Sequence, residues 1–386
     1  MRVYLDNAAT SWPKPEAVYL ACDRYAREVG AAAGRGAHRH AAEAQRVVDG
    51  ARQACAQLLD ARDPRRIVWT ANGTDALNLA LHGILREGDR VVTTVVEHNS
   101  VLRPLADLAA RRRIDVQFVP CDDEGFCDPD DFTPLLKRRV RLVAVSHASN
   151  VTGAVQDLEA VAHRARRAGA LLLVDAAQTV GHLPWSIDQL APDLVAASAH
   201  KGLLGPLGLG VLHVGPEAQD QLRPVRQGGG GEDSLSPFPP QRLPDRWEAG
   251  NLNVPALAGL QAAAQFLRAQ GLHAIAQHER QLVARLREGL APIPGVKVYG
   301  PAAPERRAAV VSVGIDGYDP QDAAAILDAS FGVQCRAGLH CAPRIHQALG
   351  TANAGGLVRF SPGWSTSLED VDAAVAAVAA LAEHRL

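Results

Sequence analysis

Lys201 lies between two apolar runs of this chain, within the order Ser198-Ala-His200-Lys201-Gly. Burying an ammonium group is costly unless another interaction compensates for the lost water. One compensation is covalent, because a lysine held as an imine with an aldehyde cofactor carries its charge differently from a free ammonium. The alternative is a lysine on a solvated β-turn, and the segment taken alone favours that alternative.

Other polar residues offer groups that such a cofactor needs. Gly73 and Thr74 precede an apolar helix, whose free N–H groups could seat a phosphate, unless Thr74 is simply its cap. Asp175 follows an apolar run, where its carboxylate could hold a pyridinium nitrogen protonated or else cap a turn. Gln178 could bond the ring hydroxyl. His98 could stack on the ring and shuttle protons, although a lone histidine is more often polar surface.

Ser198 and His200, which flank the lysine, could donate hydrogen bonds to the same phosphate. Together with Lys201, these residues supply each part of a pyridoxal-phosphate site. The combination is far more specific than any member, and it reverses the preference for a turn lysine.

Cys341 belongs to a second cluster, which runs from Arg336 to Arg344. Most cysteines of an intracellular protein are small buried apolar residues, but Cys341 lies shortly after Gly338, in a loop with positive neighbours. Positive neighbours lower a thiol's pKa and favour the thiolate nucleophile. A metal site is the alternative, with four closely spaced candidates: Cys335, His340, Cys341 and His346. Their spacing matches no familiar zinc pattern, so we expect no metal.

Arg359 falls on or at the end of an apolar run near the C-terminus. A buried arginine requires an anion, and a substrate carboxylate could bind both forks of its guanidinium. An internal salt bridge is the alternative.

Secondary structure must bring these residues together, and strand and helix patterns alternate over the first two thirds of the chain. The predicted strands are Arg66–Thr70, Arg90–Val96, Asp115–Val119, Val140–Ser146, Ala170–Val174, Leu194–Ala197 and Gly210–Val214. The predicted helices include Glu16–Glu28, Ala41–Leu59, Thr74–Leu85, Ser100–Arg112 and Leu158–Ala168. This alternation predicts an α/β fold with a mostly parallel sheet and helices on both faces. Ligands bind beyond the carboxyl ends of such strands, where five of the apolar runs stop at polar residues.

A helix over Pro255–His278 leads into a second, α+β unit. Its predicted elements are strands Val296–Tyr299, Val310–Ile315, Val333–Arg336 and Leu357–Ser361 and helices Pro320–Phe331, Arg344–Leu349 and Leu368–His384. We expect three parts: an N-terminal segment (1–15) packing with the small domain, a large cofactor-binding domain (16–260), and a small C-terminal domain (261–386) carrying the Cys341 loop. The irregular segment 227–250 is typical of a functional or interface loop.

Composition excludes several classes of protein. Hydrophobic residues make up 47% and charged residues 21%, and the net charge is −2, so nucleic acid is not expected as a partner. The first residues lack the apolar core of a signal peptide, and no apolar run reaches membrane-spanning length. Six cysteines without a dense spacing pattern fit a reducing compartment. We expect a soluble cytoplasmic protein without a membrane partner.

The motifs resemble those of the cysteine desulfurases and selenocysteine lyases, within the class V aminotransferase-like, fold type I enzymes that use pyridoxal phosphate. The resemblance covers essentially the whole chain. It rests on Asp6-Asn7-Ala-Ala-Thr-Ser-Trp-Pro-Lys-Pro, Gly34-Arg-Gly-Ala-His38-Arg, Glu97-His98-Asn99-Ser, Ser146-His-Ala-Ser-Asn150-Val-Thr-Gly, Asp175-Ala-Ala-Gln178-Thr, His200-Lys201-Gly-Leu-Leu-Gly-Pro and Arg336-Ala-Gly-Leu-His-Cys341-Ala-Pro.

The resemblance implies the aspartate aminotransferase-like fold, with a seven-stranded sheet in the large domain, and pyridoxal 5'-phosphate as cofactor. It implies L-cysteine or selenocysteine as substrate and, from the short Cys341 loop, the group II branch. That branch implies a homodimer in which the loop before Gly250-Asn251 reaches the partner's active site, and a sulfur-acceptor protein is a further possible partner.

Residue by residue, the resemblance implies a Schiff-base role for Lys201 and a persulfide role for Cys341, with His98 as the catalytic stacking histidine. The implied cofactor contacts are Gly73, Thr74, His98, Asp175, Gln178, Ser198, His200, Lys201 and Asn251. The implied substrate contacts are Asn7, His38, Asn150, Arg336 and Arg359. The chain departs from the family at Asn251, where a threonine is usual, and after Arg359, where Ser361-Pro-Gly363 replaces the usual Asn-Thr pair.

The resulting hypothesis is a desulfurase that converts L-cysteine to L-alanine and leaves a persulfide on Cys341 for an acceptor. A C–S lyase of the same fold would release pyruvate and sulfide instead, and a selenocysteine lyase could bypass the thiol. A regulatory or scaffold protein that binds the cofactor without turnover is less compatible with an intact Lys201 and Cys341. A nicotinamide dehydrogenase would rest on Gly205–Gly210 alone, which does not open a helix.

Overall fold

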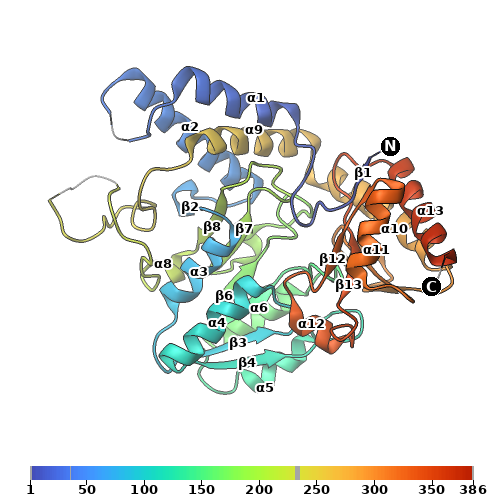
Figure 1. Ribbon diagram of the computed structural model, residues 1–386. Coiled ribbons are helices and arrows are strands. Elements are labelled where there is room, and N and C mark those ends of the chain that lie inside the picture. Colours follow the sequence, from blue (N-terminus) through green and yellow to red (C-terminus); the bar gives the residue numbers. More distant parts are fainter. Residues whose placement is uncertain (1, 35, 231–234, 385–386) are drawn as a thin grey trace.

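The computed structural model describes residues 2–34, 36–230 and 235–384, and it contains a seven-stranded and a four-stranded sheet within these ranges (Figure 1). Arg35 of the predicted Gly34–His38 motif and residues 231–234 of the irregular segment lie outside the described residues. The predicted α/β fold class, with a large sheet and a smaller α+β unit, is confirmed.

The large sheet has the strand order β2-β8-β7-β6-β5-β3-β4. Its strands are β2 (Ile67–Thr70), β3 (Arg90–Thr94), β4 (Asp115–Val119), β5 (Leu142–Ser146), β6 (Leu171–Asp175), β7 (Leu194–Ser198) and β8 (Gly210–Val214). Strands β3 to β7 pair in parallel, whereas β8 is antiparallel to both of its neighbours. The mostly parallel sheet therefore carries the carboxyl ends of β3, β5, β6 and β7 on one edge.

Apolar side chains cover both faces of this sheet because successive residues of a strand point to opposite sides. Val68 joins the core beneath α3 (Gly73–Ile84) and α4 (Asn99–Arg112), while Ile67 and Trp69 join the core on the other face. That second face is covered by α2 (Arg39–Leu58), α6 (Leu158–Arg167) and α9 (Val254–Gln270). The remaining helices here are α1 (Glu16–Arg24), α5 (Phe132–Leu135), α7 (Ile187–Leu190) and α8 (Pro216–Gln219). Helix α1 packs against α9 and continues as a π-helical turn over Tyr25–Val29, which contacts both α2 and α9 (Figure 1).

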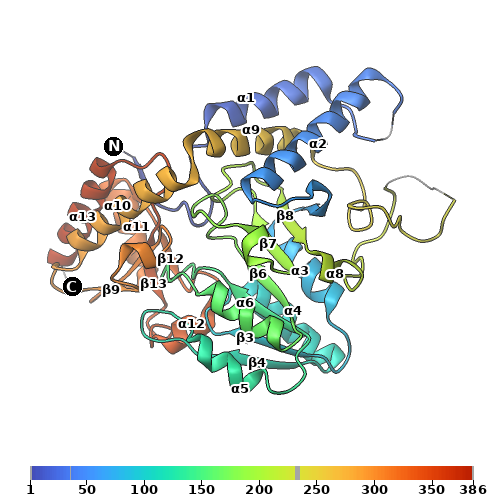
Figure 2. The ribbon, with the colours of Figure 1, turned by 180° about the vertical axis from the view of Figure 1, so that it is seen from behind.

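The smaller sheet is antiparallel, in the order β12-β13-β10-β9. Its strands are β9 (Val296–Tyr299), β10 (Val311–Ile315), β12 (Arg336–Gly338) and β13 (Leu357–Phe360). Helices α10 (Leu272–Leu290), α11 (Pro320–Phe331) and α13 (Leu368–Glu383) enclose its core, and α12 (Pro343–Ala348) follows the Cys341 loop. Figure 2 shows these orange and red elements together on one side of the molecule. Strand β1 (Val3–Tyr4) pairs with β11 (Val333–Gln334), which joins the N-terminal residues to this unit.

Two predicted elements were wrong in their extent. The helix predicted over Pro255–His278 is interrupted at Gly271, whose φ of 82° ends α9 and lets α10 start in a new direction. The strand predicted over Val333–Arg336 is divided at Cys335 between two sheets. The predicted domain boundary between residues 260 and 261 falls inside α9, which ends at Gly271. The division of the chain into domains stays a prediction.

No helix among the described residues is both long and apolar enough to cross a membrane.

Candidate active site

A cavity of about 410 Å³ opens beyond the carboxyl ends of the parallel strands, where the sequence places its polar residues. Ten of the predicted site residues line it: Gly73, Thr74, His98, Asn150, Asp175, Gln178, Ser198, His200, Lys201 and Arg336. A larger cavity of about 750 Å³ lies near the opposite strand ends, around His213, and contains none of them. The cavity therefore gathers predicted site residues that are up to 263 positions apart, from Gly73 to Arg336.

The start of α3 forms one wall of this cavity. Asn72 caps the helix by accepting the Asp75 N–H at 2.9 Å, so the Thr74 hydroxyl is not the cap and instead lies 2.8 Å from Ser100 Oγ. A Cβ atom on Gly73 would collide with Ser198 Oγ. Glycine therefore lets the helix start approach the end of β7, and it leaves backbone N–H groups at the positive end of the helix dipole.

Asp175 ends β6 and is buried, with 7% of its surface exposed. Its hydrogen bond within the described residues comes from the Ala177 N–H, 3.0 Å from Oδ1. Burial raises the pKa of Asp175, because a carboxylate out of water is destabilised unless a cation faces it. Nearby, Gln178 donates its side-chain N–H to the Ala8 carbonyl at 3.1 Å.

Lys201 follows β7 and is the amine of the cavity wall. Burial lowers its pKa to about 8, and the negative charge of Asp175 opposes this change. The positive charges of Arg359 and Arg336 lower the pKa further. A sizeable fraction of Lys201 is therefore a neutral amine near pH 8, the form that can attack a carbonyl carbon or accept a proton.

His98 stands directly before α4 and lines the same cavity. Its Nδ1 accepts the Ser100 N–H at 3.0 Å, so the proton of the neutral ring is assigned to Nε2. Burial lowers the pKa of His98 to about 4, and the positive charges of Lys201 and Arg336 add to this effect. The ring is therefore uncharged at neutral pH and suits stacking on a flat ligand.

Cys341 lies in an adjoining cavity of about 420 Å³ that shares Thr74, His98 and Ser100 with the first. The backbone of His340 and Cys341 is left-handed, with φ of 47° and 57°, a strained conformation for residues other than glycine. Asn150 Nδ2 donates to the His340 carbonyl at 2.7 Å, which supports this turn. Arg336 Nη2 lies 3.6 Å from Cys341 Sγ. The guanidinium is thus placed to stabilise negative charge on the sulfur.

Arg359 and Asn7 do not line the cavity. The Arg359 side chain is fully buried and pairs with Asp6, with Nη2 2.9 Å from Oδ1, while its Nη1 donates to the Asn150 carbonyl at 3.1 Å. The internal salt bridge weighed as the alternative for Arg359 is therefore present. Asn7 Nδ2 donates to the Ser361 carbonyl at 2.9 Å. The substrate roles of Asn7 and Arg359 stay predictions.

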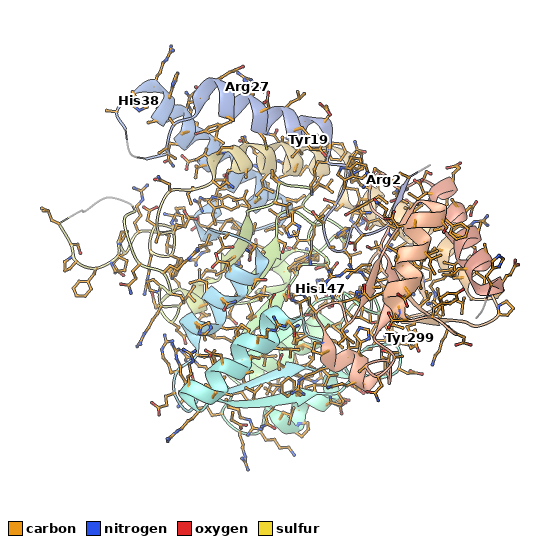
Figure 3. The ribbon with its side chains drawn as sticks, in the orientation of Figure 1. Arg2, Tyr19, Arg27, His38, His147 and Tyr299 are labelled. Carbon is orange, nitrogen blue, oxygen red and sulfur yellow. The ribbon has the colours of Figure 1, made fainter. Side chains whose placement is uncertain are left out.

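His38 and Asn251 also lie outside the cavity walls. His38 caps α2, and Figure 3 shows it at the outer edge of the molecule. Asn251 is exposed, between the irregular segment and α9. The predicted site roles of His38 and Asn251 stay predictions.

Sequence reasoning missed the roles of Ser100, Ser146 and Glu97. Ser100 Oγ lies 2.8 Å from both Thr74 Oγ1 and His98 Nδ1, and both serines line the cavity. Glu97 is fully buried and accepts the Ser146 N–H at 3.0 Å and its hydroxyl at 2.8 Å. Burial raises the pKa of Glu97 to about 7 against the effect of these bonds. The sequence signal that could have found Glu97 and Ser100 is their position beside His98 in one short motif.

Within the described part of the chain, no three His, Cys, Asp or Glu side chains gather closely enough to hold a metal ion. His340 Nε2 lies 3.1 Å from the Leu357 carbonyl, and His346 Nδ1 lies 2.7 Å from Thr351 Oγ1. These two histidines thus serve the packing of the Cys341 loop.

The donor set of the cavity fits pyridoxal phosphate. Asp175 would face the ring nitrogen, because its buried carboxylate accepts only one hydrogen bond, from a backbone N–H, and forms no salt bridge within the described residues. The α3 start, Thr74, Ser198 and His200 would hold the phosphate, and His200 Nδ1 is buried without a partner among the described residues. Gln178 would contact the ring hydroxyl and Lys201 the aldehyde.

Comparisons with known proteins identify the family of the chain. The family model for class-V aminotransferases matches residues 3–374. A probable cysteine desulfurase from Methanothermobacter thermautotrophicus is 35% identical over 96% of this chain and 92% of its own length. One from Pyrococcus abyssi is 36% identical over 96% and 92%.

Solved structures are similar over the same extent. The apo cysteine desulfurase of Thermococcus onnurineus superposes with a TM-score of 0.93 at 36% identity, covering 99% of this chain and 95% of that one. A cysteine desulfurase from Escherichia coli superposes with a TM-score of 0.90 at 31% identity, covering 100% and 96%. The chain therefore belongs to the class V aminotransferase family.

Proposed function

We propose that this protein is a cysteine desulfurase that converts L-cysteine to L-alanine and leaves a persulfide on Cys341. The family depends on pyridoxal phosphate. The observation that carries the proposal is the pair of adjoining cavities, with the amine of Lys201 in one and the thiol of Cys341 in the other. A C–S lyase needs the lysine but gives no role to a thiol in the adjoining cavity.

When bound, pyridoxal phosphate supplies an aldehyde that links to amines and a ring that takes up the electrons released at the substrate Cα. The chain's own residues do the rest. Asp175 would hold the proton on the ring nitrogen, and the neutral His98 ring would pack against the cofactor. Lys201, whose pKa of about 8 leaves part of it as free amine, accepts the Cα proton.

Sulfur transfer falls to Cys341. Its thiolate attacks the substrate sulfur, so that an S–S bond forms while the substrate Cβ–S bond breaks. The electron pair of the broken bond stays on the carbon skeleton, which leaves as alanine after protonation. The Cys341 sulfur is oxidised to a persulfide and the substrate carbon is reduced, so the step requires no external oxidant. Arg336, 3.6 Å from the sulfur, stabilises the attacking thiolate.

The experiment incubates the purified protein with cysteine and measures both the mass added to Cys341 and the released amino or keto acid. The expected result is alanine and one added sulfur atom, both abolished in C341A while the cofactor's colour is retained. Pyruvate in place of alanine would establish the C–S lyase instead. Alanine release at the normal rate by C341A would refute the role of Cys341, and selenocysteine tests whether that substrate bypasses the thiol.

We further propose that two copies of the chain form the complete enzyme. His38 and Asn251 carry predicted site roles but lie outside the cavity of their own chain. The described parts of the segment between α8 and α9 project from the body in Figure 1, with Leu235 97% and Phe238 74% exposed. Exposed apolar residues on a projecting segment are typical of an interface. A partner would cover them and bring Asn251 to the other subunit's phosphate seat.

Mixed dimers test this arrangement. K201A and H38A are each expected to be inactive, but a dimer containing one of each has one site with an intact lysine and the other subunit's His38. Co-expression should therefore restore part of the activity, and light scattering should give twice the chain mass. A monomer in solution, or no activity in the mixed dimer, would contradict the proposal.

The outer cavity beside Cys341 suits the approach of an acceptor thiol, and we propose a sulfur-acceptor protein as the physiological partner. We also propose a cytoplasmic location, supported by six cysteines that are all free thiols in the structure.

A further inference from the structure

The peptide group before Lys201 is gripped by an N-terminal segment, residues 6–14, which we call the N-terminal strap. The His200 carbonyl accepts the Ser11 N–H at 2.9 Å and the Lys14 ammonium at 2.8 Å. Thr10 Oγ1 lies 3.1 Å from the same oxygen. A carbonyl oxygen has two lone pairs, so these donors saturate it.

The carbonyl of Lys201 itself is held by the same strap. Ser11 Oγ lies 3.0 Å from the Lys201 oxygen and accepts the Lys14 ammonium at 2.6 Å. A hydroxyl has one proton, and the Lys201 oxygen is a nearer acceptor for it than the His200 oxygen at 3.2 Å. Lys14, Ser11 and Lys201 therefore form one chain of hydrogen bonds, and both carbonyls that flank the Lys201 side chain are fixed.

Lys14 is an unusual choice for a purely structural contact. Its ammonium is half-buried, and its hydrogen bonds in the described residues go to a hydroxyl and a peptide carbonyl. Burying a charge against neutral acceptors is costly, whereas a hydrogen bond from a charged donor is about twice as strong as a neutral one. Burial of the Lys14 ammonium therefore costs some folding stability, and its strong hydrogen bonds hold the Lys201 backbone in place.

The strap is anchored at its other end in the smaller unit. Asp6 pairs with Arg359 at 2.9 Å, and Asn7 donates to the Ser361 carbonyl at 2.9 Å. The Trp12 N–H donates to Asn7 Oδ1 at 3.2 Å, which connects the anchor to the part that holds Lys201. The grip on Lys201 thus rests on a fixed support rather than on a loose terminus.

We propose that Ser11 and Lys14 are positioning residues for Lys201. They hold its backbone so that the amine returns to one point in the cavity each time it is released, which lowers the entropy lost on reaching the reacting carbon. Neither side chain lines the cavity, so their action passes through the Lys201 peptide. This inference rests on the assignment of Lys201 in the proposed function.

The test follows cofactor attachment to cofactor-free protein. The first-order rate of covalent attachment at saturating pyridoxal phosphate is read from absorbance and confirmed by borohydride reduction. The affinity for pyridoxine phosphate, which has no aldehyde, measures non-covalent binding. In K14M and S11A the attachment rate should fall about tenfold. The affinity for pyridoxine phosphate and the KM for L-cysteine should stay within about twofold of the wild-type values, because the cavity walls are unchanged.

Matched variants complete the design. K14R and S11T keep the donor groups and should recover most of the attachment rate. K137M removes an exposed lysine far along the chain and should behave as wild type. The cofactor-free unfolding temperature is measured for every variant, so that a folding defect is recognised.

Attachment at the wild-type rate in both K14M and S11A would overturn the proposal. So would a parallel loss of attachment rate, pyridoxine phosphate affinity and unfolding temperature, since that pattern means a structural role only. A separate measurement tests the proposed function. The chain has four lysines, Lys14, Lys137, Lys201 and Lys297, so borohydride-fixed cofactor can be mapped by peptide mass. Cofactor fixed anywhere but on Lys201 would refute that assignment, whatever the strap variants do.

Discussion

Replacing Arg336 by methionine should slow the alkylation of Cys341 by iodoacetamide about tenfold at neutral pH. The thiolate is the reactive form of cysteine, and Arg336 Nη2 lies 3.6 Å from the sulfur. Methionine keeps much of the side-chain length and removes the charge. The variant therefore isolates the electrostatic contribution of the guanidinium to the thiolate.

The magnitude follows from Coulomb's law. Two unit charges 3.6 Å apart interact by about 1 kcal/mol in water and about 5 kcal/mol at an effective dielectric constant of about 20. Arg336 and Cys341 are both partly exposed, and the outer cavity is open to water, so the lower part of this range applies. A loss of about 1.4 kcal/mol in the stabilisation of negative charge on the reacting sulfur corresponds to a tenfold slower reaction.

The assay is selective because the other thiols of the chain are poor nucleophiles. Burial raises the pKa of Cys55 and Cys335 to about 12 and that of Cys121 to about 11. Burial also raises the pKa of Cys22 and Cys127. Peptide mass spectrometry over time should therefore find Cys341 labelled first in the wild-type protein.

R344M is the matched control. Arg344 follows Cys341 by three residues, but its guanidinium lies over the Phe118 ring, 3.7 Å from the centroid. We expect its loss to change the alkylation rate by less than about twofold. An unchanged rate in R336M, or equal effects in the two variants, would refute the view that Arg336 activates the thiol.

Three further predictions concern the cofactor, pH and the helix junction. D175N should weaken pyridoxal phosphate binding about 100-fold, because a charged hydrogen bond to the ring nitrogen is lost; equilibrium dialysis measures the affinity, and an unchanged value would exclude Asp175 as the ring's partner. Burial raises the folded-state pKa of Glu97 from 4.5 to about 7, so its contribution to stability is full below pH 4.5 and is lost as the pH rises through 7. The free energy of unfolding of wild type relative to E97Q should therefore fall over this interval in urea titrations, and a constant difference would show that Glu97 does not titrate there. G271A should destabilise the protein by about 1 kcal/mol, because alanine is strained at the φ of 82° between α9 and α10; thermal unfolding measures the loss, and an unchanged midpoint would mean that the junction relaxes.

Much of the site could be predicted from local patterns. Apolar runs that stop at Asp175 and Lys201 mark the carboxyl ends of strands, and parallel strands place such ends on one edge. Most of the predicted residues could therefore be placed at one site without knowledge of the strand order of the large sheet. The same patterns failed where a single residue changes the chain direction. Gly271 lies inside an uninterrupted apolar pattern, and only its left-handed backbone shows that one helix has become two.

Long-range contacts decided the rest. Arg359 carries the pattern of a substrate ligand, yet it pairs with Asp6 from 353 positions earlier. His38 and Asn251 belong to motifs of the site but lie outside its walls, because a single chain does not contain the surface that they are proposed to face. Hydrophobic periodicity in the sequence does not predict such long-range contacts.

The sequence by itself determined which chemical groups are available and which strand ends carry them, because alternation and turn residues act over a few positions. The tertiary structure alone decided how those groups are tuned. The pKa of Lys201 depends on its burial and on charges from distant parts of the chain. The grip of Ser11 and Lys14 on the Lys201 peptide depends on a strap about 190 residues away in sequence, and that contact exists only once both units have packed.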